Sequence, residues 1–209
     1  MERTITVTGT GSATAAPDLV TLTLGVETRR ETAAKAYDDA GTSAAAVAAS
    51  LRAAGIRDGD LRTSGLNLRA DVMWVEGQGQ KVSAYVASTT LHVGIRSHGD
   101  APAAIASAVA AGGDDIRING LEQGLADPSR ATAQAQEAAW QDALARAEQY
   151  AALASARLGS VVSISQQPVH SGPVPMGGMV RASYVAETLP VEAGESVISA
   201  SVTVEWELI

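Results

Sequence analysis

The sequence predicts an α+β fold of two similar β-α-β-β units, each an antiparallel sheet packed by one helix, with a long helix in the second half. Two observations carry this prediction. Residues 82–95 and 194–208 are both long alternating segments, far apart in the chain, and a helix-like, Ala-rich segment precedes each. Alternation of apolar and polar residues indicates strands with one buried face. The repeated order of elements predicts an internal duplication.

A single domain is expected over residues 1–209, with internal halves at about 18–96 and 115–208. A chain of this length can bury roughly 70% of the surface that it exposes when unfolded. Its hydrophobic residues, 46% of the total, include no Phe and are mainly Ala, Val and Leu. We therefore expect helices and sheets that approach one another closely around small side chains.

In the first half, residues 19–27 have the period of a half-buried strand, and the shorter strand 5–9 precedes them. Gly9 and Gly11 are expected to let the chain bend between the two. An Ala-rich helix follows over 31–54 and ends at Gly55. The chain then runs extended over 61–75, turns at 76–80 and returns along 84–96. The buried face of this returning strand is expected to hold Tyr85, Ala87, Leu91, Val93 and Ile95.

In the second half, a short helix over 101–111 and a weaker strand over 115–125 lead to a long helix. Asp127 is its expected N-cap and Pro128 its first residue. The helical spacing predicts a buried stripe of Trp140, Leu144, Ala147, Ala151, Ala154 and Leu158. A strand over 161–168 follows, and the last strand is expected to bury Ile198, Ala200, Val202, Val204, Trp206 and Leu208.

Charge and composition exclude several classes of function. The net charge of −8 repels phosphate backbones, and three Trp and four Tyr offer little base stacking, so no nucleic-acid partner is expected. The absence of Cys excludes disulfides, thiol catalysis and thiolate metal sites. No apolar segment reaches the roughly 20 residues of a spanning helix, so no membrane span is expected.

The remaining motifs supply no catalytic residue, no cofactor-binding residue and no metal ligand. The stretch GTGSAT at 9–14 has Thr14 where a dinucleotide fingerprint has its third Gly, and it leads into a strand. His92, His98 and His170 lack the spacing of metal ligands and are expected on the surface. Asp58 and Asp60 lack the later ligands of a calcium loop, and a turn between helix and strand is the preferred interpretation.

The segment 168–194 is longer than most irregular loops. Its apolar side chains Met176, Met179, Val180 and Tyr184 are candidates for a partner or oligomer contact, because Met suits adaptable surfaces. A disordered hairpin tip is the alternative.

Segments covering nearly the whole chain resemble the SIMPL domain family, also called DUF541. They are 5–36, 53–68, 85–95, 126–154, 158–165 and 190–208, in that order. The family includes a bacterial oxidative-stress defence protein and a periplasmic immunogenic protein. The resemblance implies an α+β fold, frequent export, ring-like or channel-like homo-oligomers and an association with stress resistance, without agreed catalytic residues or cofactors. Thr10 departs from the pattern, since an acidic residue is common at that turn position.

The leading hypothesis is a non-catalytic, self-associating domain with a role in stress resistance or cell-envelope assembly. The partner surfaces would be the segment 168–194 and exposed strand edges. The rival is a metal-dependent or antioxidant enzyme that uses His92 with Arg96 and an acidic residue. A signalling adaptor is the third hypothesis.

The start of the sequence, MERTITVTG, has no apolar export core. The expected location is therefore the cytoplasm. The alternative is a periplasmic or secreted protein whose export segment was removed from the sequence.

Overall fold

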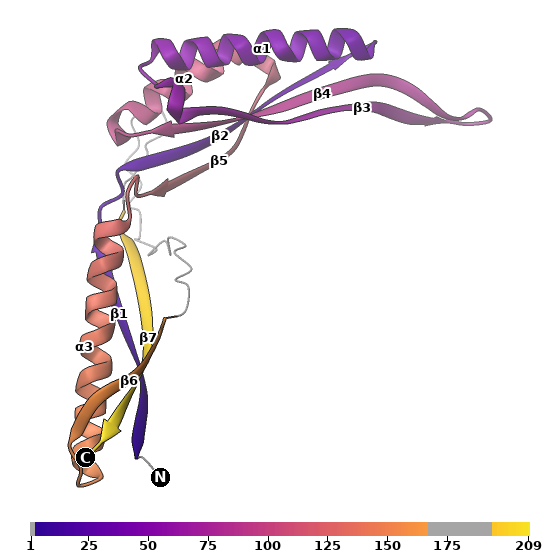
Figure 1. The fold of residues 1–209 in the computed structure, drawn as a ribbon. Coiled ribbons are helices and arrows are strands. Elements are labelled where there is room, and N and C mark those ends of the chain that lie inside the picture. The colour runs from indigo at the N-terminus through magenta and orange to yellow at the C-terminus, as the bar shows by residue number, and fades with distance from the viewer. Residues whose placement is uncertain (1–2, 167–193) are drawn as a thin grey trace, which may run out of the picture. The chain divides into compact units, whose positions relative to one another are not determined.

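A computed structural model describes residues 3–166 and 194–209 and confirms the α+β class, with antiparallel sheets of three and four strands (Figure 1). The described residues divide into two compact units. Residues 3–17, 125–166 and 194–209 form the three-stranded unit, and residues 18–124 form the four-stranded unit. None of the helices in these described ranges is long and apolar enough to cross a membrane.

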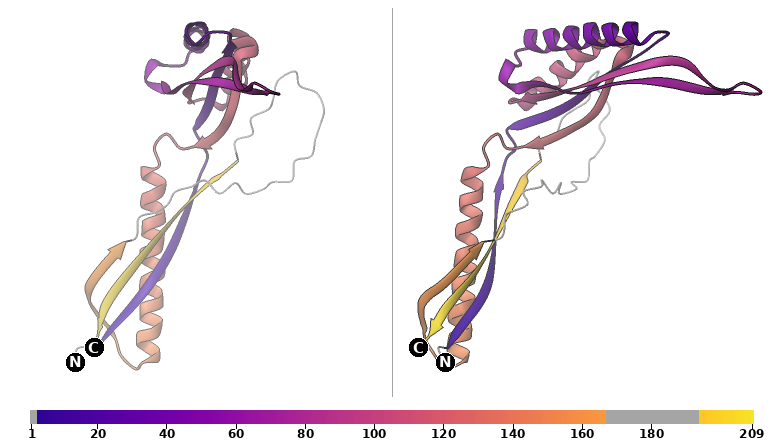
Figure 2. Two further views of the ribbon diagram at one scale, coloured as in Figure 1. Left: turned by 90° about the vertical axis from the view of Figure 1, so that its right-hand side faces the viewer. Right: turned by 45° about the vertical axis from the view of Figure 1, so that its right-hand side comes forward.

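The three-stranded unit contains β1 (Thr4–Ala15), β6 (Leu158–Gln166), β7 (Ser196–Leu208) and α3 (Ser129–Leu153). The sheet order is β1-β7-β6, and both pairs are antiparallel. Figure 2 shows α3 running along this sheet. The alternation predicted for β7 is confirmed at Ile198, Ala200, Val204 and Trp206, which are buried, whereas Val202 and Leu208 are half-buried.

The buried stripe of α3 shares only Ala147 and Ala151 with the predicted one. Its buried residues recur every four positions and all are alanine: Ala131, Ala135, Ala139, Ala143, Ala147 and Ala151. Trp140 and Leu144 only flank the cluster around Val204 and Trp206, and Ala154 lies beyond the helix. The helix also starts later than predicted, at Ser129, with the carboxylate of Asp127 accepting a hydrogen bond from the Ser129 N–H at 2.9 Å.

The alanine stripe is selected by glycines on β1. The strand continues through Gly9 and Gly11, so the predicted bend is wrong. A β-carbon on Gly9 would stand 2.7 Å from the β-carbon of Ala143, and one on Gly11 would stand 2.7 Å from the carbonyl carbon of Ala138. Both distances are shorter than real β-carbon contacts, so only glycine on the strand allows this approach of helix to sheet.

Thr10 lies between these glycines, within β1 and not in a turn. Its backbone N–H donates to Asp142 Oδ2 on α3 at 2.9 Å. This hydrogen bond and the ion pair with Arg146 hold the pKa of Asp142 below its usual range. The contact is a second, polar link between β1 and α3.

The four-stranded unit has the sheet order β3-β4-β2-β5, all antiparallel. Its strands are β2 (Leu19–Arg30), β3 (Leu61–Val75), β4 (Gly79–Ile95) and β5 (Ile116–Gly124), and its helices are α1 (Ala33–Ala53) and α2 (Ala101–Gly112). Three short 3-10 turns, η1 (Asp58–Asp60), η2 (His98–Asp100) and η3 (Gly113–Asp115), connect them. Both helices contribute to the core, which contains Val20, Leu22, Leu24, Val47, Leu51, Leu91, Val93, Ile95, Ala104 and Ala108.

Both units contain the order strand, helix, strand, strand, with the last strand in the middle of the three. In one unit these are β1, α3, β6 and β7, and in the other β2, α1, β3 and β4. The strand β5, which opens the predicted half 115–208, pairs with β2 instead, while β1 pairs with β7. The duplication and the halves 18–96 and 115–208 stay predictions.

Candidate functional site

The most unusual surface of the four-stranded unit is an extension of β3 and β4, residues 66–84, which we call the arm. Figure 1 shows these two strands continuing beyond the N-terminal end of α1. Lengths explain this, because the 21 residues of α1 span about 32 Å and the 17 residues of β4 span about 56 Å. The helix is therefore too short to cover the whole hairpin.

The arm carries an apolar face that nothing in the described residues covers. Leu68 pairs with Ala87, which packs against Ala36 and Ala40 of α1. Residues of β3 at every second position share that helix-facing side, and they form a stripe that consists of Leu66, Leu68, Ala70, Val72 and Trp74. All five are exposed, and Trp74 retains 73% of its accessible surface. Val82, opposite Val72 on β4, extends the stripe.

The opposite face of the arm carries polar side chains together with Met73, and it is tied to the sheet. Arg29 on β2 donates from Nε to Asp71 Oδ2 at 2.9 Å and from a terminal nitrogen to Ser83 Oγ at 3.2 Å. Ser83 Oγ donates in turn to the carbonyl oxygen of Asp71 at 3.0 Å. These contacts lie at the β-bulge between Asp71 and Val72. They fix the base of the arm against β2.

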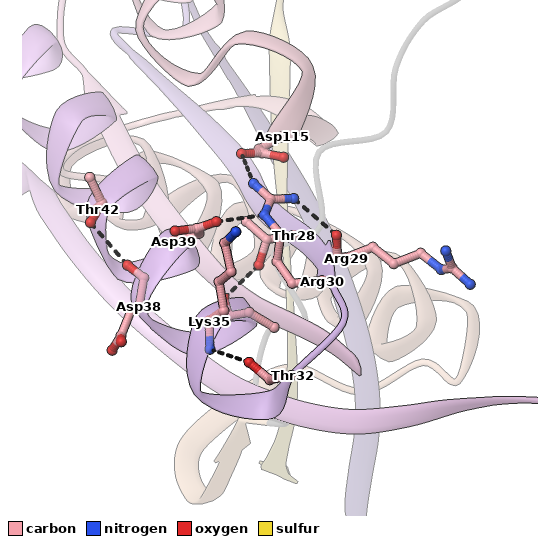
Figure 3. A network of polar contacts seen from close by, with 10 residues as sticks. Thr28, Arg29, Arg30, Thr32, Lys35, Asp38, Asp39, Thr42 and Asp115 are labelled. Carbon is pink, nitrogen blue, oxygen red and sulfur yellow. Dashed lines mark hydrogen bonds and ion pairs between the residues drawn. The ribbon is translucent and has the colours of Figure 1, made fainter. Parts of the chain in front are cut away.

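A polar network fixes the start of α1 beside the arm (Figure 3). The buried hydroxyl of Thr28 donates to the carbonyl oxygen of Ala36 at 2.6 Å, and Thr32 caps the helix by accepting from the N–H of Lys35. Arg30 bonds Asp39 at 2.5 Å and approaches Asp115 at 3.6 Å. The hydrogen bond with Asp39 raises the pKa of Arg30. Helix and sheet are thus held in one position where the stripe begins.

A groove opens where α1 passes over β3 and β4. Its volume is about 530 Å³, and its walls include Tyr37, Gly41, Ala45, Thr63, Leu66 and Thr89. A β-carbon on Gly41 would have no neighbour within 4 Å, so the groove is open at the helix. Leu66 belongs to both the groove and the stripe, which makes the two surfaces continuous.

The residues proposed for a rival enzyme are placed differently from what a metal site requires. His92 Nε2 lies 2.9 Å from Ser64 Oγ, and Nδ1 lies 3.4 Å from Thr23 Oγ1. Arg96 instead pairs with Asp60, at 2.9 Å. Within residues 3–166 and 194–209 no group of three or more His, Asp or Glu side chains could hold a metal ion. Both ring nitrogens of His92 therefore face hydroxyl groups.

Asp58 and Asp60 form the turn η1, as preferred from the sequence. Hydrogen bonds from Arg96 and Arg57 lower the pKa of Asp60 to about 2. The carboxylate stays ionised near neutral pH and joins the turn to the end of β4, which is a structural role.

The predicted contact residues Met176, Met179, Val180 and Tyr184, like His170, lie outside the described residues. The stripe on the arm was not predicted as a contact surface. A comparison of lengths could have found it. The strands of the hairpin predicted over 61–96 are longer than the helix predicted before them, so part of the hairpin must extend beyond the helix.

Comparison with known proteins gives relatives over almost the full chain. A 26 kDa periplasmic immunogenic protein of Brucella melitensis is 30% identical over 98% of this chain and 84% of that protein. The protein of the same name in Brucella abortus is 29% identical over the same shares. The uncharacterized protein YggE of Escherichia coli is 28% identical over 95% of this chain and 78% of its own length.

The expected cytoplasmic location is corrected by these relatives, because both Brucella proteins are named as periplasmic. That expectation depended on the segment MERTITVTG, whose residues 4–9 belong to β1 and carry no information on compartment. A family model described as SIMPL, a protein of unknown function (DUF541), matches residues 5–206. The chain therefore belongs to the SIMPL (DUF541) family.

Proposed function

We propose that this protein acts by self-association, as a non-catalytic SIMPL domain whose copies meet through the apolar face of the arm. The observation that carries the proposal is the exposed stripe from Leu66 to Trp74. Contiguous exposed apolar side chains mark interaction surfaces, and Trp is enriched among the residues that dominate binding energy.

Charge favours a second copy as the occupant of this surface. The whole chain carries a net charge of −8, so two copies repel each other over most of their surfaces. The arm has two cations, Arg69 and Lys81, and two anions, Asp71 and Glu76, and is neutral. A neutral, apolar arm is the part of the chain where like copies can meet at least electrostatic cost.

The wider role follows from the relatives. Two of them are named as periplasmic proteins, and the family resemblance suggests an association with stress resistance. Self-association would serve stress resistance by building an assembly in the cell envelope. The contact residues Met176, Met179, Val180 and Tyr184 and the signalling-adaptor hypothesis stay predictions.

Light scattering coupled to size-exclusion chromatography tests the proposal on the full chain. We expect the parent to form a defined oligomer and the double variant Leu68→Glu with Val72→Glu to be monomeric, because both charges would be buried without partners. The matched control is Asn67→Glu with Met73→Glu, which places the same charges on the opposite face. A parent that stays monomeric at high concentration overturns the proposal.

A further inference from the structure

We propose that two copies of this chain stack their arms face to face, in opposite directions, about a twofold axis at Ala70, with Trp74 of each copy entering the groove of the other. This inference rests on the proposed self-association and names the surfaces that meet. Three features of the four-stranded unit support it: the symmetry of the stripe, the distance from groove to arm tip, and the volume of the groove.

The stripe is nearly palindromic. Reading along β3, the large residues Leu66 and Trp74 lie at its ends, Leu68 and Val72 lie inside them, and Ala70 lies at the centre. Stacking two stripes in opposite directions about Ala70 places Leu66 against Trp74 and Leu68 against Val72. The same patch then serves both copies, as a twofold interface requires. The small residue at the centre allows the axis to pass between the strands.

The groove cannot receive the Trp74 of its own chain. Leu66 lies in the groove, and Trp74 lies eight residues further along the same strand, about 26 Å away. In the stacked arrangement, the partner's Trp74 lies over Leu66 and therefore over the groove. The groove and Trp74 are thus too far apart to meet within one copy, but the antiparallel stacking of two arms brings the groove of each copy to Trp74 of the other.

The groove is large enough for an aromatic side chain. Its volume of about 530 Å³ is within the range of roughly 300–1,000 Å³ typical of ligand pockets. Its walls are Ala, Gly, Leu, Tyr and Thr residues with one carboxylate, Asp38. The apolar part of this lining suits an indole ring, whose N–H could bond a threonine hydroxyl. A rigid aromatic side chain in an apolar pocket is a common source of binding energy between proteins.

The first experiment compares dissociation constants by sedimentation equilibrium of the full chain. We expect Trp74→Ser, which empties the groove, and Gly41→Leu, which fills it, each to weaken association at least about tenfold. Gly41→Leu meets open space in the monomer, and leucine favours the helix, so folding is preserved. The control Met73→Ser removes an exposed side chain of β3 from the opposite face, and we expect a change within about twofold.

The second experiment tests the twofold register. The chain has no Cys, so one introduced thiol is unique. A short bismaleimide bridges the roughly 10 Å expected between stacked sheets. It should link Ala70→Cys into dimers and leave Arg69→Cys, on the opposite face, monomeric. Circular dichroism establishes that each variant is folded.

The outcomes separate this inference from the proposed function. A parent that associates while Trp74→Ser and Gly41→Leu associate equally well overturns the docking inference and leaves self-association standing. Equal linking of Ala70→Cys and Arg69→Cys, or no linking of either, also overturns the inference. A parent that is monomeric at every concentration overturns both. Loss of association in Trp74→Ser and Gly41→Leu, with linking of Ala70→Cys alone, supports the inference.

Discussion

The β-carbon that Gly9 lacks would overlap the backbone of Ala139 on α3. Strand and helix therefore meet backbone to backbone at this point, where glycines of β1 face alanines of α3. This contact explains how a chain without Phe closes a three-stranded sheet. Close approach replaces large side chains as the source of dispersion contacts.

Gly9→Ala and Gly11→Ala are expected to destabilise the three-stranded unit. Either methyl group would force α3 away from β1, and overpacking of this kind costs about 1–3 kcal/mol or more. Urea unfolding followed by Trp fluorescence measures the effect, because Trp140 and Trp206 lie in this unit with ring centroids 6.0 Å apart.

The matched control for these variants is Gly120→Ala, on β5. That position is also a strand glycine, but a β-carbon there has no neighbour within 4 Å. We expect its midpoint of unfolding to stay near that of the parent. An equal loss of stability in Gly9→Ala and Gly120→Ala would contradict the close-packing explanation.

The sequence predicts strands better than it predicts the face of α3. Residues of β7 alternate strictly between apolar and polar, so sheet burial follows directly from the letters. In α3 the large residues Trp140 and Leu144 dominate any hydrophobic stripe, yet packing against Gly9 and Gly11 selects the alanines. The face of a helix depends on the surface it meets, and that surface comes from a strand more than 100 residues earlier.

The sequence predicts the arm as a hairpin but does not identify its exposed apolar face as a contact surface. The alternation of Leu66 to Trp74 has the same pattern as a half-buried strand, and pattern alone does not say whether a helix covers it. Coverage depends on where α1 starts, and the contacts of Thr28 and Arg30 fix that start. The groove likewise requires α1 and β3 to be placed together before Gly41 and Leu66 can be recognised as its walls.

Asp60→Asn is expected to remove a pH-dependent contribution to stability. The pKa of Asp60 is lowered in the folded protein to about 2 from an ordinary value of 3.8. The carboxylate therefore stabilises the fold fully above about pH 4, and this contribution is lost as the pH falls toward 2. We expect the variant to lose about 1–2 kcal/mol at pH 7 and to show a shallower loss of stability between pH 4 and 2.

Asp58→Asn is the control for this measurement. Asp58 pairs with Arg52 at 2.6 Å, but its side chain is 83% exposed, so its removal should change stability little. Thermal unfolding across the pH range would compare the three proteins. Identical acid profiles of the parent and Asp60→Asn would contradict the assigned role of the Arg57–Asp60–Arg96 cluster.

His92→Ala is expected to leave metal content and peroxide turnover unchanged, since the hydrogen-bond partners of His92 are the hydroxyls of Ser64 and Thr23. Elemental analysis of the purified protein and peroxide turnover by parent and variant would measure this. We expect no stoichiometric metal and no difference in turnover. A metal bound by the parent and lost in His92→Ala would instead support the rival enzyme.

Asp71→Ala is expected to loosen the arm, because it removes the carboxylate that joins Arg29 to the bulge beside Ser83. Local opening exposes backbone to proteases, and Arg69 and Lys81 supply trypsin sites within the arm. We expect cleavage at these two residues to accelerate several-fold, as measured by mass spectrometry of limited digests. Asp58→Ala, which removes an exposed ion pair in the turn before β3 and outside the arm, should leave the rate unchanged. A rigid arm also binds at lower entropic cost, so Asp71→Ala should weaken self-association although the stripe itself is intact. Faster cleavage with unaltered association would show that the contact between Arg29 and Asp71 orders the arm without contributing to assembly.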